Sequence, residues 1–123
     1  SIALLVTQAA VKRFCDGEKP LELHDFAEQY DLPIRLVRGV AEKLEKAGVL
    51  SPVEDQDKNT ELYQPARDVA DLTVLFVLTA WDDEGAADLG VEESAMLLKL
   101  KSAIAEIRRA VASSPSNALL KNL

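Results

Sequence analysis

The stretch LPIRLVRGVAEKLEKAGVL, residues 32–50, decides the fold. Pro33 stands where the first turn of a helix tolerates a missing N–H, and Gly48 supplies the left-handed residue that ends a helix. Four apolar residues between them recur at helical spacing and form one stripe: Val37, Val40, Ala41 and Leu44. We therefore expect an amphipathic helix of the kind that follows the turn in a helix-turn-helix.

The neighbouring segments extend this pattern to a winged helix. Residues 2–15 read as an amphipathic helix, and residues 23–30 as a short one with Phe26, Ala27 and Tyr30 facing inward. After Gly48, extended segments at 49–54 and 61–65 flank a polar turn, as in a hairpin with a long loop. The fold class that we expect is mainly α with a small β-hairpin: a winged helix-turn-helix followed by a long C-terminal helix.

The C-terminal third carries the most apolar helices. A fourth helix, capped by Asp68 or Asp71, runs through LTVLFVLTAW and is apolar on all sides, so something must cover it. Past the connector DDEGAADLG, residues 91–112 form an amphipathic helix that either folds back on helix four or meets its copy. We expect residues 1–90 to form the winged-helix domain with helix four and the acidic connector, and residues 91–123 the C-terminal helix with a largely flexible tail. The tail leucines, Leu119, Leu120 and Leu123, could still dock on the domain. The candidate protein or dimer interface is Phe76, Leu97, Leu100, Ile104, Ile107 and Val111, of which the last five have coiled-coil spacing.

The net charge and its distribution along the chain indicate which kinds of partner it can bind. The chain has 123 residues and a net charge of -7. Residues 68–90 contain six acids and no base, which disfavours binding of phosphate. The single cysteine, Cys15, is expected to be a small buried hydrophobe. No apolar run is long enough to cross a bilayer, and the first residue is not a methionine, so we expect the chain to begin inside a longer sequence.

Residues for chemistry are sparse. His24 has no nearby cysteine or second histidine with which to bind a metal, and the run from Asp82 to Glu84 lacks the spacing of a calcium loop. No glycine-rich phosphate loop is present, and the few aromatic residues are expected in the core. We therefore expect no catalytic residues, no metal and no cofactor.

Arg35 and Arg38 are the candidate nucleic-acid contacts. Both lie near the start of the helix that would enter a major groove, and arginine suits guanine or phosphate. Glu42 and Glu45 follow on the same helix, however, and the wing sequence EDQDKNTE is acidic. The balance disfavours duplex DNA and favours arginines that are solvated or paired with acids.

Four segments together resemble the cytoplasmic C-terminal region of the YihY/BrkB family of inner-membrane proteins, over about residues 2–80. They are SIALLVTQAAVKRF, LPIRLVRGVAEKLEKAGVL, LYQPARD and the helix after it. The resemblance implies a cytoplasmic regulatory module that contacts protein and reaches the membrane through upstream segments. Many members bear a ribonuclease BN label, but a metal-dependent ribonuclease needs clustered ligands that one histidine does not supply. The matching positions are structural: Phe14, Leu36, Val37, Leu44, Gly48, Tyr63, Pro65, Ala66 and Arg67.

The same arrangement also resembles the Rrf-type winged-helix repressors, in which a long dimerising helix follows the winged domain. That resemblance implies the alternative function, a dimeric DNA-binding transcriptional regulator. One cysteine is too few to hold an iron–sulfur cluster.

Overall fold

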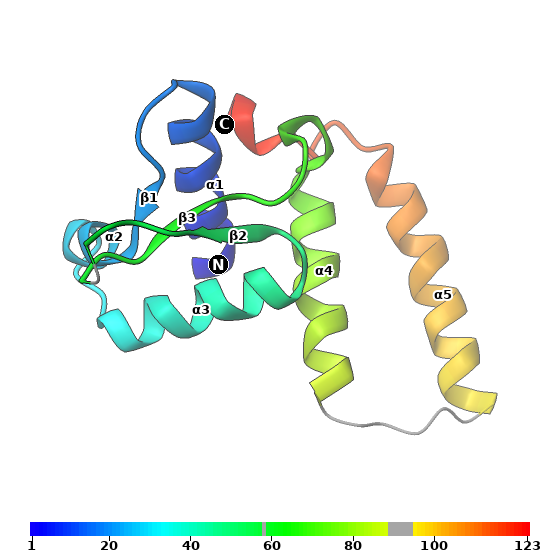
Figure 1. The fold of residues 1–123 in the computed structure, drawn as a ribbon. Coiled ribbons are helices and arrows are strands. Elements are labelled where there is room, and N and C mark those ends of the chain that lie inside the picture. The colour runs from blue at the N-terminus through cyan, green and yellow to red at the C-terminus, as the bar shows by residue number, and fades with distance from the viewer. Residues whose placement is uncertain (58, 89–94) are drawn as a thin grey trace.

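A computed structural model of the chain describes residues 1–57, 59–88 and 95–123 (Figure 1). It shows the predicted fold class, a mainly helical winged helix-turn-helix with a small antiparallel sheet. The elements are α1 (Ile2–Cys15), β1 (Leu21–Glu22), α2 (Leu23–Gln29), α3 (Ile34–Lys46), β2 (Leu50–Val53), β3 (Leu62–Pro65), the 3-10 turn η1 (Val69–Asp71), α4 (Val74–Asp88), α5 (Ala95–Ala112) and the 3-10 turn η2 (Leu120–Asn122).

The helix-turn-helix forms as the sequence predicts. The whole inward stripe of α3 is buried against α1 and α2. Gly48 ends α3 with a φ of 78°, a conformation that glycine adopts without steric cost. Between α2 and α3, Asp31 is also left-handed, with a φ of 52°. That tight turn lets the Leu32 N–H donate to the Ala27 carbonyl at 2.8 Å.

The sheet has one strand more than predicted. The hairpin of β2 and β3 is confirmed, with Tyr63 of β3 opposite Pro52 of β2. On its other side β3 pairs with β1, where Leu21 lies opposite Tyr63, so the strand order is β1-β3-β2. A strand of two residues is too short to produce an alternating pattern, and its two residues pair with residues 42 and 40 positions away.

Three predicted core residues are exposed. Phe14 is 57% exposed, and Cys15 and Tyr30 also lie at the surface, although the Tyr30 ring packs on Phe26 with centroids 4.7 Å apart. Val11 is the last buried residue of α1, so the final turn of that helix extends past the layer that covers it. The prediction that Cys15 and all the aromatic residues are core was therefore wrong.

The fourth helix begins later and ends later than predicted. Asp68 caps η1 by accepting from the Ala70 N–H at 2.9 Å, and it does not cap α4. Two other side chains satisfy the first turn of α4: the Thr73 hydroxyl accepts from Phe76 N, and the Asn117 carbonyl oxygen from Leu75 N. Leu72, predicted inside the helix, is instead buried below its start. At the other end α4 continues to Asp88, so most of the predicted acidic connector is helical.

The C-terminal tail is docked, contrary to the prediction that it is largely flexible. Leu119 forms an antiparallel bridge with Thr73, and Leu120 is 2% exposed. Two side chains of α1 bind backbone oxygens of the tail: Gln8 at Leu123, and Lys12 at Lys121 over 2.8 Å. The tail thus completes the core beside α1 (Figure 1).

Helix α5 runs antiparallel to α4 and on its outer side (Figure 1). The predicted C-terminal helix is thus present from Ala95, while its first predicted residues, 91–94, lie outside the described residues. Within the described ranges, no helix combines the length and apolar character required to cross a membrane.

Candidate interaction surfaces

The outward stripe of α3 carries two bases followed by two acids: Arg35, Arg38, Glu42 and Glu45. Their spacing of three, four and three residues places them on one face of the helix. Arg35, Glu42 and Glu45 are exposed, and Arg38 is partly exposed. The two candidate nucleic-acid contacts therefore do share a surface, and two carboxylates share it with them.

Arg38 is held by the last residue of the wing loop, Glu61, which directly precedes β3. Its Nε donates to Glu61 Oε1 at 2.6 Å, and its Nη2 donates to Glu61 Oε2 at 3.1 Å. This two-pronged hydrogen bond raises the pKa of Arg38 above its ordinary value and fixes the plane of the guanidinium. The sequence predicts arginines that are solvated or paired with nearby acids, and the acid that pairs with Arg38 is Glu61, the last residue of the acidic wing stretch EDQDKNTE. The pair neutralises a cation that the DNA hypothesis requires.

Glu22 joins the wing to the start of α2. It is the N-cap of α2, where Oε1 accepts from the N–H groups of His24 and Asp25. Its Oε2 accepts from the Glu61 N–H at 3.0 Å and lies 3.0 Å from His24 Nδ1. Partial burial opposes ionisation of Glu22, but the hydrogen bonds from Glu61 and His24 prevail and lower its pKa. The lone histidine is therefore part of a structural network that joins β1, α2 and β3.

We expect acid to weaken the fold through Glu22. Because the folded-state pKa lies below the ordinary value of 4.5, the stabilisation is fully present above that pH and disappears as the pH falls through the folded-state pKa. Glu22→Gln keeps an acceptor oxygen without the charge. Urea unfolding across pH should show wild type more stable than Glu22→Gln at pH 7, with the gap closing below pH 4.5. A gap that is constant with pH would contradict this reading.

The side chains around α3 give this surface a predominantly negative charge. Burial raises the pKa of the Tyr63 phenol, and the charges of Glu45, Glu42 and Glu61 raise it further. Glu28 and Asp31 lie just before α3 and are exposed, as are Glu54, Asp55 and Asp57 of the wing. A duplex placed on this face would bring its phosphates towards these carboxylates.

Phe76 is less available than predicted for an interface residue. It is partly buried against the core, and the Arg67 guanidinium lies 4.8 Å from its ring centroid. The exposed part of its ring lines a hollow of about 340 Å³ between the end of α3 and α4. Lys43 likewise lies over Trp81, 4.0 Å from the ring centroid. Helix α4 is therefore covered on one side by the winged domain and its cations, as its apolar sequence requires.

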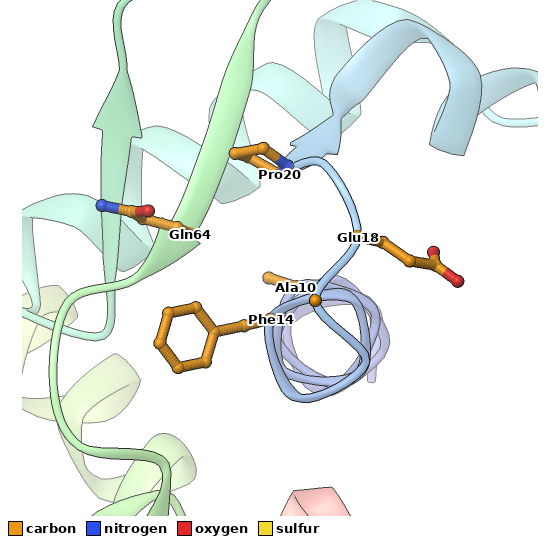
Figure 2. Close-up of a pocket in the computed structure, with 6 residues that line it drawn as sticks. Ala10, Phe14, Glu18, Pro20 and Gln64 are labelled. Carbon is orange, nitrogen blue, oxygen red and sulfur yellow. The ribbon is translucent and has the colours of Figure 1, made fainter.

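An open recess of about 300 Å³ lies where α1 ends, lined by Phe14, Pro20 and Gln64 (Figure 2). The carboxylate of Glu18 points away from it (Figure 2). Gln64 brings an amide there, but no charged group of the lining faces inward. We assign no chemistry to this recess.

The apolar stripe of α5 is exposed where the structure describes it. Ile104, Ile107 and Val111 are 45%, 63% and 43% exposed. The side chains of Leu97 and Leu100 lie outside the described residues. An ion pair of 3.6 Å joins Arg108 of α5 to Asp83 of α4. Contact with α4 therefore leaves the described part of the stripe facing solvent.

Among the described residues, no group of three or more His, Cys, Asp or Glu side chains is placed to hold a metal ion. The sequence missed the network of Glu22, His24, Arg38 and Glu61 because its members are up to 39 positions apart. The acid before a helix start was the one local signal, since Glu22 caps α2.

Comparison with known proteins bears on the fold. No family model matches the chain, and no curated protein matches it. A crystal structure described as a "Putative transcriptional regulator" from Listeria innocua is similar, with a TM-score of 0.61 and 18% sequence identity. The likeness covers 98% of this chain and 79% of that one. At this identity the likeness shows a shared fold, which is consistent with the winged helix described above.

Proposed function

We propose that this chain is a non-catalytic winged-helix module that contacts protein and does not read DNA. The observation that carries the proposal is the pair between Arg38 and Glu61 on an acidic face. In a winged helix the outward face of α3 is the surface that meets DNA. Here one of its two arginines is already neutralised within the fold, and the surrounding carboxylates outnumber the remaining arginine.

Counterion release sets how strongly such a face can bind a duplex. Each phosphate neutralised by a lysine or arginine adds to the affinity, and each nearby carboxylate opposes it. Arg35 is the arginine of the α3 stripe that makes no hydrogen bond or ion pair with another described residue. A single free arginine supplies too little binding free energy to offset the repulsion from Glu42, Glu45 and the wing.

The test is a titration of the chain against fluorescent random duplex DNA, followed by anisotropy at several salt concentrations. We expect no binding at physiological salt. A complex of micromolar or higher affinity that weakens steeply with salt would overturn the proposal. Arg35→Ala is the matched variant, because a true DNA contact would lose affinity and reduce the salt dependence.

A DNA-binding regulator is the second candidate. Two observations favour it: the fold shared with the Listeria innocua protein and the exposure of Arg35 on α3. The acidic wing weighs against it. The same titration decides between the two, since only the regulator predicts salt-sensitive binding.

The narrower proposal is that the module is the cytoplasmic part of an inner-membrane protein of the YihY/BrkB type. Its support is the resemblance of residues 2–80, from SIALLVTQAAVKRF to the helix after LYQPARD. The coding sequence upstream of Ser1 tests it. Several long apolar segments there would support this placement, and a start codon within a few residues would contradict it.

A further inference from the structure

The outward face of α3 contains a glycine that nothing in the described part of the chain explains. Gly39 is exposed in the middle of the helix, which runs along the outer edge of the winged domain (Figure 1). A Cβ atom added there would come within 4 Å of nothing beyond its chain neighbours and its own helix backbone. Glycine destabilises a helix interior relative to alanine, because it loses more backbone freedom on folding. The fold therefore gains nothing from Gly39.

The residues beside Gly39 suit a contact with protein. Leu36 lies one turn before it and Glu42 one turn after it, so the three are neighbours on the helix surface. The Leu36 side chain is 42% exposed, and Tyr30, at the end of α2, is 44% exposed. A glycine lets another backbone approach closely, and aromatic side chains are enriched where proteins meet. We call Leu36, Gly39, Glu42 and Glu45 the Gly39 surface.

The charge of the Gly39 surface comes mainly from its acids. Arg38 is paired with the wing loop, Lys43 lies over an aromatic ring of α4, and Lys46 lines the hollow against α4. Glu42 and Glu45 are exposed. Five exposed acids of the neighbouring segments add to them: Glu28, Asp31, Glu54, Asp55 and Asp57.

This charge selects the kind of partner. A carboxylate surface repels the phosphates of a duplex and attracts lysine and arginine side chains. A second copy of this chain is a poor occupant, because its net charge is -7. A basic segment of another protein satisfies both the charge and the exposed apolar side chain of Leu36.

We propose that the Gly39 surface binds a basic amphipathic helix of a partner protein. The backbone of that helix lies against Gly39, its apolar side chains cover Leu36, and its lysines or arginines pair with Glu42 and Glu45. This deepens the proposed function, on which it rests, by naming the surface through which the module contacts protein and the chemistry of its partner.

The probe is a short fluorescent peptide of leucine and lysine, with the leucines spaced to form one face of a helix. Its counterpart has glutamate in place of every lysine. By anisotropy we expect the chain to bind the lysine peptide with a Kd on the order of 10 μM at physiological salt, the strength of a weak transient interface. The glutamate peptide should not bind.

Gly39→Gln tests the close approach. Glutamine is a good helix former, so the midpoint of urea unfolding should rise, while the added side chain should weaken binding of the lysine peptide about tenfold. Ala105→Gln is the matched control, because it adds the same group at an exposed position of α5 and should leave binding unchanged. A variant that folds more stably and binds less well separates contact from folding.

Glu42→Gln with Glu45→Gln tests the charges. The affinity for the lysine peptide should fall about tenfold or more, since both pairing carboxylates are lost. Asp16→Asn with Asp71→Asn changes the net charge equally at exposed sites away from α3, and should change the affinity less than twofold.

Four outcomes would overturn the proposal. The wild-type chain could fail to bind the lysine peptide, or bind the glutamate peptide equally well. Gly39→Gln could leave the affinity unchanged, or the two pairs of acid variants could weaken binding alike. Salt-sensitive DNA binding in the separate titration would overturn the proposed function. A chain that binds neither the duplex nor the lysine peptide would overturn only the partner assigned to the Gly39 surface.

Discussion

Leu120→Ala is expected to lower the free energy of unfolding by about 2–5 kcal/mol, the range for removing a buried leucine side chain. Leu120 is 2% exposed and lies within three residues of the C-terminus. It is anchored on both sides, because its N–H donates to the Leu72 carbonyl at 3.1 Å and the Val74 N–H donates to the Ala118 carbonyl at 3.0 Å. Truncation would leave a cavity between α1 and the start of α4.

Leu123→Ala is the matched control for Leu120→Ala. It removes the same atoms from a side chain that is 56% exposed, so its effect should stay within about 0.5 kcal/mol. Urea unfolding followed by far-UV circular dichroism measures both. If the two variants unfold alike, the tail is not part of the core.

The docking of the C-terminal tail could not be predicted from the sequence, whereas the buried stripe of α3 could. The buried stripe of α3 was predictable because its apolar residues repeat with the helical period. That repeat indicates burial whichever element covers the helix. Leu119 and Leu120 lie in a segment without a period, and their burial depends on Thr73 and Leu72 far upstream. The sequence predicts that these leucines could dock, but nothing local specifies where.

The candidate site was likewise predictable only where it depends on local spacing. The exposed stripe of Arg35, Arg38, Glu42 and Glu45 follows from helical spacing alone, and pairing with an acid was one of the two states expected of Arg38. Which acid it pairs with depends on the register of the hairpin, which brings Glu61 beside α3. Residues 23 positions apart in different elements share no sequence pattern. The partner of Arg38 could therefore be found only in the folded chain.

The second large effect is expected from reversing the charge of the α3 face. Glu42→Lys, Glu45→Lys and Glu54→Lys together should give the winged helix non-specific affinity for duplex DNA, with a Kd of about 1–100 μM at physiological salt. All three residues are exposed, on α3 and at the start of the wing, so the fold should tolerate lysine there. The shape that presents α3 to a groove is already present, and the three lysines would replace repulsion with attraction.

A matched control separates the position of the new charges from their number. Asp16→Lys, Asp71→Lys and Asp82→Lys change the net charge by the same amount at exposed sites away from α3. Anisotropy against the duplex should then report binding by the α3 variant alone, weakening with salt in proportion to the phosphates contacted. If both variants bind equally, net charge governs the interaction and the α3 face has no special role. If neither binds, the face is closed to DNA by its shape as well as by its charge. Binding by the α3 variant alone would mean that carboxylates at three positions are what keep this winged helix from DNA.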